Sequence, residues 1–194
     1  MSEKAPLEKF NIKISQCTKC SLRATCQRVV FGSGSAEAQI MLLGEAPGKK
    51  EDELGIPFVG STGRILDKML EGIKIKREDV YLTNICKCRP PENRDPLPEE
   101  VTTCAYWLEK QIQIINPKII ITLGRFALNY FLPQAKISAV HGIILEINTE
   151  KIGTIKIFPL HHPAAARINR QTRALFTQDF QKIPTILKQI KKEQ

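Results

Sequence analysis

Cysteine spacing constrains this 194-residue chain more than any other feature. Cys17 and Cys20 form a Cys-x-x-Cys pair, and further cysteines lie far downstream at positions 86, 88 and 104. In a reducing compartment, such a set is typical of metal ligands rather than of disulfides. The spacing therefore predicts a domain that a bound metal ion or metal cluster stabilises.

Spacing alone leaves two ligands and the nature of the metal open. Cys86 and Cys88 alternate across one residue, so an extended segment would point them to opposite faces. Cys104 lies on the apolar face of a predicted helix, where a free cysteine is also a typical core residue, and Cys26 fits ordinary packing. A four-cysteine zinc site and a 4Fe–4S cluster are both compatible with these positions.

Length and charge bound the function. We expect one domain over residues 1–194, because a chain of this length buries a substantial core. Lys and Arg outnumber Asp and Glu by 29 to 20, which gives a formal net charge of +9. This excess favours a polyanionic partner such as nucleic acid, although a solvated basic surface explains it equally well. Because neither a membrane-spanning apolar run nor a signal segment is visible, we expect a cytoplasmic protein without a membrane partner.

Apolar periodicity predicts alternating strands and helices. The predicted strands are residues 39–43, 80–85, 118–123, 143–147 and 155–158. The predicted helices include residues 7–14, 124–131 and 175–190, the last with a kink at Pro184. Two more are predicted from their first residues: one capped by Ser61 or Thr62, and one that begins at Pro98 and runs to Ile115. Residues 89–98 are rich in proline and predict a loop. This alternation indicates an α/β fold whose mostly parallel sheet is covered on both faces, with ligands at the carboxyl ends of the strands.

A run of small residues and proline, Gly44-Glu45-Ala46-Pro47-Gly48, follows the first predicted strand. It is one residue too short for a phosphate-binding P-loop, and Lys50 stands where that motif needs Ser or Thr, so nucleotide hydrolysis is not expected. The run does offer backbone N–H groups and the Glu45 carboxylate to a ligand. Taken alone, it would be no more than a turn with an exposed glutamate.

The run is one of five motifs that occur together in order. They are residues 44–48, 55–63 (Gly-Ile-Pro-Phe-Val-Gly-Ser-Thr-Gly), 83–85 (Thr-Asn-Ile), 88–91 (Cys-Arg-Pro-Pro) and 162–166 (His-Pro-Ala-Ala-Ala). In this order, and with the cysteines, the chain resembles the family-4 uracil-DNA glycosylases, the iron–sulfur type found in thermophilic archaea and bacteria. The resemblance runs from Cys17 to the region of Arg170, which is nearly the whole chain.

The resemblance implies the fold and the cofactor. The expected fold is a three-layer α/β/α sandwich around a central four-stranded parallel sheet. The expected cofactor is a structural 4Fe–4S cluster near the N-terminus that ties the first segment of the chain to residues 89–98 and the following helix. Its ligands would be Cys17, Cys20, Cys88 and Cys104, with Cys26 and Cys86 unligated.

The resemblance also implies roles around a uracil that is flipped out of DNA, because its glycosidic bond cannot be reached inside the base stack. Phe58 is expected to stack on the base and Asn84 to read its edge, although a core Phe and a turn Asn would be ordinary alternatives. Glu45 is expected to help place the attacking water. His162, rather than His161, is expected to face uracil O2 and to stabilise the charge of the departing base. The pocket would be lined by Gly44, Glu45, Ala46, Pro47, Phe58, Asn84 and His162.

A basic loop after His162 is expected to press on the DNA minor groove while the base is out. Its candidate DNA-binding side chains are Arg167, Asn169, Arg170 and Arg173. Arg167 stands where relatives often carry an apolar residue. The sequence therefore does not determine which side chain fills the gap in the duplex. Asn93 is a further candidate for the pocket.

The expected function is hydrolysis of the N-glycosidic bond of deoxyuridine in single- or double-stranded DNA, which leaves an abasic site for base excision repair. We expect no lyase activity, because no lysine lies in a recognised nucleophile motif. A non-enzymatic zinc or iron–sulfur module that binds nucleic acid explains the charge and cysteines, but it leaves Asn84 and His162 without a role. A third hypothesis is a related glycosylase with a wider substrate range, or a member of the branch that traps uracil covalently. That branch carries a longer, basic, His-containing insertion in the pocket loop, and residues 89–98 show no such insertion. We expect a monomer associated with the nucleoid, and contact with a replication clamp stays open.

Overall fold

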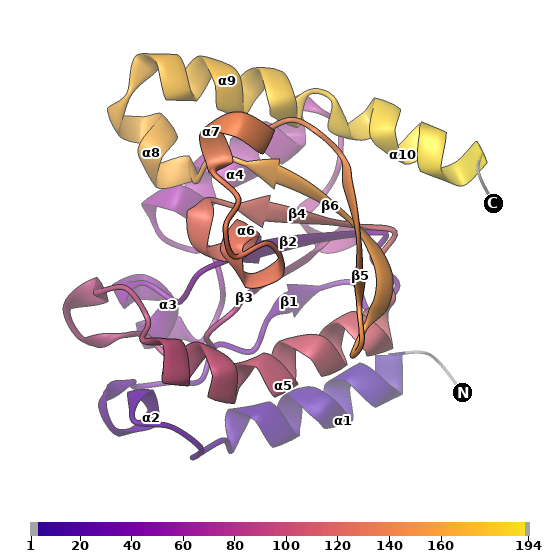
Figure 1. The fold of residues 1–194 in the computed structure, drawn as a ribbon. Helices are drawn as coiled ribbons and strands as arrows, with labels where there is room; N and C mark the ends of the chain where they lie inside the picture. The colour runs from indigo at the N-terminus through magenta and orange to yellow at the C-terminus, as the bar shows by residue number, and fades with distance from the viewer. Residues whose placement is uncertain (1–3, 193–194) are drawn as a thin grey trace.

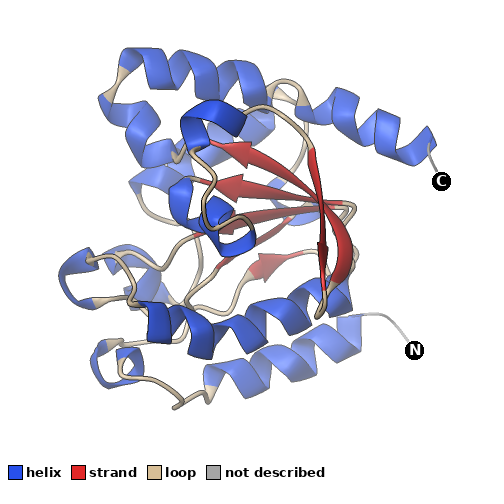
Figure 2. Ribbon diagram, viewed as in Figure 1, coloured by secondary structure: helices blue, strands red, loops and turns tan. Residues whose placement is uncertain are grey.

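The computed structural model describes residues 4–192, in which short strands alternate with helices (Figures 1 and 2). The strands are β1 (Ser33–Gly34), β2 (Ile40–Gly44), β3 (Tyr81–Asn84), β4 (Ile119–Leu123), β5 (Leu145–Thr149) and β6 (Gly153–Leu160). The helices are α1 (Lys4–Ser15), α2 (Leu22–Thr25), α3 (Lys49–Leu54), α4 (Ser61–Gly72), α5 (Pro98–Ile115), α6 (Arg125–Phe131), α7 (Ile137–Val140), α8 (Pro163–Ile168), α9 (Arg170–Phe180) and α10 (Ile183–Lys192), with 3₁₀ helices η1 (Arg77–Asp79) and η2 (Pro91–Asn93).

The strands form one sheet in the order β1-β3-β2-β4-β6-β5. Strands β3, β2, β4 and β6 are mutually parallel, while β1 and β5 pair antiparallel at the two edges. The predicted parallel α/β fold is therefore confirmed, and the expected four-stranded parallel sheet corresponds to the four central strands. Their carboxyl ends meet at one edge, which is where ligands bind in folds of this kind.

Helices cover both faces of the sheet (Figure 2). Strand β2 shows why, because all of its residues are buried and its side chains alternate between two cores. Met41 and Leu43 pack in the core that also holds side chains of α1, α5 and α6, whereas Ile40 and Leu42 pack with α4, α9 and α10. A strand buried on both faces has to be continuously apolar, as the sequence is here. Within residues 4–192, no helix is long and apolar enough to cross a membrane.

Two predicted helix boundaries are wrong. The expected helix over residues 175–190 is two helices, because α9 ends at Phe180 and α10 begins at Ile183, so that Pro184 lies in a first turn that needs no N–H donor from it. Helix α4 is capped by Gly60 rather than by Ser61 or Thr62. The start of α5 at Pro98 is confirmed.

Helix α4 packs very closely on the loop that precedes it. A Cβ atom at Gly63 would overlap the backbone carbonyl of Phe58. Phe58 itself has a φ of 52°, a left-handed conformation that an aromatic residue rarely adopts. The position of Phe58 thus depends on the missing side chain at residue 63.

We therefore expect Gly63→Ala to lower the free energy of unfolding by about 1–3 kcal/mol, because the added methyl group overpacks a closed contact. Gly72→Ala is the matched control, since it lies in the same helix and its added Cβ would have no atom of another segment within 4 Å. That change should be neutral or stabilising by up to about 1 kcal/mol, because alanine favours the helix. Urea unfolding of both variants measures the difference, and equal effects would contradict the packing described here.

Candidate functional site

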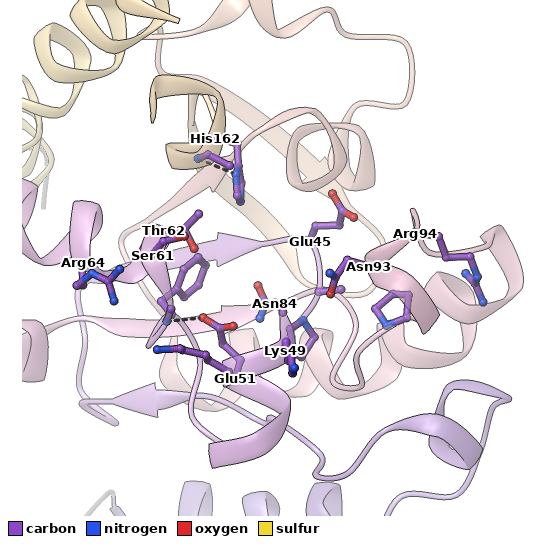
Figure 3. A pocket seen from close by; sticks show the side chains of 18 residues that line it. Glu45, Lys49, Glu51, Ser61, Thr62, Arg64, Asn84, Asn93, Arg94 and His162 are labelled. Carbon is purple, nitrogen blue, oxygen red and sulfur yellow. Dashed lines mark hydrogen bonds between the residues drawn. The ribbon is translucent and has the colours of Figure 1, made fainter. Parts of the chain in front are cut away.

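A pocket of about 500 Å³ opens at the carboxyl ends of the parallel strands (Figure 3). Strand β2 leads into it at Glu45, β3 ends in it at Asn84, and the segment after β6 contributes His162. Six of the seven pocket residues that the sequence predicted line its wall: Glu45, Ala46, Pro47, Phe58, Asn84 and His162. The fold thus brings together loops that are more than a hundred residues apart in the chain.

The seventh predicted residue, Gly44, lies behind the pocket wall, and its lack of a side chain leaves room for the residues that form the wall. It is the register neighbour of Asn84 across the β2–β3 pair. A Cβ atom at Gly44 would lie 2.7 Å from Cζ of Phe58 and would overlap Oδ1 of Asn84. Any larger residue would therefore push the ring or the amide out of place.

The segment that carries Phe58 is held by a buried carboxylate that the sequence analysis missed. Glu51, in α3, accepts hydrogen bonds from the backbone N–H groups of Val59 (3.0 Å) and Gly60 (2.8 Å). Arg77 donates from Nη2 to the carbonyl oxygen of Pro57 at 2.6 Å. These bonds fix the backbone on both sides of Phe58, so its left-handed conformation is imposed by its surroundings.

His162 faces the pocket as a neutral hydrogen-bond donor. Its Nδ1 accepts a hydrogen bond of 3.2 Å from the backbone N–H of Ala164, which caps helix α8. Burial lowers the pKa of His162, so the ring is neutral at physiological pH. Since Nδ1 acts as the acceptor, the proton of the neutral ring is on Nε2.

Glu45 is a carboxylate whose proton affinity is unusually high. Its pKa is raised to about 7, chiefly because burial disfavours the charged form and also because Asp95 adds negative charge, while Arg125 acts in the opposite direction. A carboxyl group with this pKa exchanges its proton near neutral pH, as a general base requires. Asn93, the further candidate, also lines the pocket, and its Oδ1 accepts a hydrogen bond from Nε of Arg89 at 2.7 Å.

Four cationic side chains also line the pocket: Lys49, Lys50, Arg64 and Arg94. These cations form no motif in the sequence, because only the fold gathers them from α3, α4 and the loop after η2. Figure 3 shows Lys49 and Arg64 apart from each other at the pocket, so positive charge lies at more than one place on its wall, beside the carboxylates of Glu45 and Glu51. Such cations suit a ligand that carries negative charge.

The predicted basic loop forms the corner between α8 and α9. Arg167 reaches the pocket edge, where its Nη1 lies 3.4 Å from Oγ of Ser61. Asn169 caps α9, and Arg173 donates to backbone carbonyls of the corner, so these two side chains also shape the loop. Ile168 at the tip is 82% exposed, which is exceptional for an isoleucine and which the sequence analysis missed.

The cysteines gather beside the N-terminal part of α5. Cys17 accepts a hydrogen bond from Nε1 of Trp107 at 3.2 Å, and Cys104 accepts one from the backbone N–H of Lys87 at 3.2 Å. The charges of Cys17 and Cys104 both act on the pKa of Cys20, which burial raises. N–H groups directed at sulfur are typical of thiolates that bind iron.

The two cysteines expected to stay unligated lie in the same region. Sγ of Cys26 is 2.8 Å from Sγ of Cys88, and a hydrogen bond from Cys86 lowers the pKa of Cys104. Across residues 4–192, no group of three or more His, Cys, Asp and Glu side chains is placed to hold a single metal ion. The donor chemistry of the thiols nevertheless fits a thiolate-bound cluster.

Glu100 joins the cysteine loop to helix α5. Its fully buried carboxylate pairs with both Nη atoms of Arg94, at 2.7 and 2.9 Å, and accepts hydrogen bonds from Oγ of Ser21 and the backbone N–H of Leu97. The hydrogen bonds from Arg94 are the main reason why the pKa of Glu100 falls to about 2. One carboxylate therefore holds together the segments on which the cysteines lie.

Comparison with known proteins gives a consistent result. Residues 31–187 match the family model of the uracil DNA glycosylase superfamily. The chain is 44% identical to the Type-4 uracil-DNA glycosylase of Archaeoglobus fulgidus over 177 residues, which cover 88% of each protein. It is 42% identical to the Type-4 enzyme of Sulfurisphaera tokodaii (91% of this chain, 83% of the relative) and 38% identical to that of Thermotoga maritima (94% and 95%). The resemblance found in the sequence motifs is confirmed.

Proposed function

The chain belongs to the uracil-DNA glycosylase superfamily, and we propose that its pocket receives a uracil flipped out of DNA and hydrolyses the N-glycosidic bond. The observation that carries this proposal is the convergence of Glu45, Phe58, Asn84 and His162 on one pocket. The products are free uracil and an abasic site, which base excision repair then processes. As its substrate is DNA, we place the enzyme in the cytoplasm at the nucleoid.

Uracil is recognised by stacking and by its hydrogen-bonding edge. The ring of Phe58 offers a flat apolar face to the base, and Asn84 offers an amide whose oxygen and NH₂ group match N3–H and O4 of uracil. Cytosine presents the opposite pattern at both positions, so the same amide opposes it. The close approach of Asn84 to Gly44 supports this role, because it limits where the amide can lie.

Bond cleavage leaves negative charge on the departing uracil. The Nε2–H group of His162 donates to O2, where part of that charge develops. A donor that is already in place for the transition state contributes about 3–4 kcal/mol in comparable oxyanion sites. The neutral state of His162 makes this possible without a proton transfer, because the ring acts as a donor and not as an acid.

The attacking water is activated on the other side of the sugar. Glu45 in its ionised form accepts a hydrogen bond from the water and takes up a proton as the new C–O bond forms. Asn93 lines the same pocket and offers an amide that helps to orient the water. The raised pKa of Glu45 supports this role, because a weakly acidic carboxyl group is a better proton acceptor.

The DNA is held by charge and opened by an apolar side chain. Arg167 and Arg170 bind phosphates at the α8–α9 corner, and the cations around the pocket opening add to this field. Ile168 at the tip of that corner fills the gap that the flipped base leaves. The exposure of Ile168 supports this assignment.

The cofactor is a 4Fe–4S cluster bound by Cys17, Cys20, Cys88 and Cys104. These four thiolates would together hold such a cluster, so the side chains need not converge on a single metal ion. When bound, the cluster supplies a cross-link between the N-terminal segment, the end of β3 and α5. The hydrogen bonds to Cys17 and Cys104 support this ligand set.

The first test measures uracil release from a labelled oligonucleotide by wild type and by Asn84→Asp. The variant loses its NH₂ donor, so uracil excision should fall by about ten- to hundredfold and the bias against cytosine should relax. Asn148→Asp, at an exposed position in β5, is the control and should match wild type. Undiminished uracil excision by Asn84→Asp would contradict the pocket assignment, and no uracil release by wild type would contradict the proposed function.

A second test uses pH. Because Glu45 acts in its ionised form and its pKa is raised to about 7, single-turnover excision should increase as pH rises from below to above 7 and then level off. Glu45→Gln should be slow at every pH and should lack this rise. If the variant kept the wild-type pH profile, Glu45 would not be the group that titrates.

A third test identifies the cofactor in anaerobically purified protein. Wild type should be brown and contain iron and sulfide with little zinc. Cys88→Ala and Cys104→Ala should lose the colour and the iron, whereas Cys26→Ala and Cys86→Ala should keep both. Colourless wild type filled with zinc would overturn this ligand assignment.

A further inference from the structure

A fully buried lysine lies between the cysteines and the base-reading end of β3. Lys87 is 1% exposed, although lysine is almost never buried without a partner. Its ammonium donates three hydrogen bonds of 2.7 Å, to Oγ1 of Thr83, to the backbone carbonyl of Asn84 and to Oε1 of Gln111. All three of its donor positions are therefore used.

The acceptors around this ammonium are themselves fixed. Thr83 donates from Oγ1 to the carbonyl oxygen of Phe31 at 2.8 Å. Gln111 donates from Nε2 to the same carbonyl at 2.7 Å and to the hydroxyl group of Tyr81 at 3.0 Å. A network with defined partners at each point holds the ammonium, and with it the carbonyl of Asn84, in one place.

The negative charge that acts on the buried ammonium is that of the cysteine thiolates, chiefly Cys104. All three hydrogen-bond acceptors are neutral, and a buried charge is costly unless an opposite charge lies near it. The backbone N–H of Lys87 also donates to Sγ of Cys104, so one residue contacts both the cysteine and Asn84.

We propose that Lys87 is a positioning residue that couples the thiolate-bound cluster to uracil recognition: thiolate charge stabilises its buried ammonium, and the ammonium fixes the end of β3 that carries Asn84. This inference rests on the proposed function of the pocket. The cysteines thereby affect base recognition without contacting the substrate. Lys87 likewise acts only through Asn84, because the pocket wall is formed by other residues.

The test compares Lys87→Met, which keeps the length of the side chain but removes its charge, with the exposed control Lys136→Met. In Lys87→Met, kcat for uracil should fall by about ten- to hundredfold, the range for losing one charge-assisted hydrogen bond, while KM for DNA stays within about threefold. The preference for uracil over cytosine should fall as well, which simple destabilisation would not cause. Lys136→Met should match wild type in each respect.

A second readout does not depend on activity. Because a positive charge next to the thiolates favours the reduced cluster, its removal in Lys87→Met should shift the reduction potential to more negative values. Thr83→Val removes only one acceptor and should cause a smaller loss of kcat in the same direction, so it decides the question if Lys87→Met does not fold. The inference would be overturned if Lys87→Met kept both the base preference and the reduction potential of wild type. If Lys87→Met does not fold, wild-type kinetics in Thr83→Val would overturn it. Failure of wild type to release uracil would instead overturn the proposed function.

Discussion

The pocket depends on the close packing of two parallel strand ends around a residue without a side chain. Gly44 ends β2 beside Asn84 at the end of β3, and the Phe58 ring also lies against Gly44. This packing brings together the amide that we propose to read the base and the ring that we propose to stack on it. The strained backbone at Phe58 persists because Gly63 gives it room and Glu51 holds the adjoining N–H groups.

Around this site, charged groups are gathered in two regions, the pocket and the surroundings of the cysteines. In the pocket, burial changes proton affinities so that Glu45 takes up a proton near neutral pH and His162 stays neutral. Beside the cysteines, the buried carboxylate of Glu100 accepts hydrogen bonds from Arg94 and the backbone of Leu97. The buried ammonium of Lys87 donates to the backbone of Asn84 and to Gln111. The second region holds chain segments in place, and the first carries out the chemistry that we propose.

Much of this arrangement could be predicted from the sequence, because strands buried on both faces are continuously apolar and parallel topology collects the loops that follow them. Glu51 and the exposed Ile168 were missed, since their importance comes from contacts and exposure that only the tertiary structure sets. Helices α3 and α8 are too short to show helical periodicity. The break before α10 was placed wrongly, because a proline fits both a kink and a first turn.

The most direct measurement of the central claim is single-turnover release of uracil from a duplex with one uracil, by wild type, His162→Ala and His161→Ala. The account predicts free uracil and an abasic site from wild type, and a loss of about 10²–10³ in His162→Ala, as for removal of one oxyanion donor. His161 is turned toward His141, 4.7 Å away between ring centroids, so His161→Ala should stay within about threefold of wild type. Full activity in His162→Ala, or a greater loss in His161→Ala, would contradict the account.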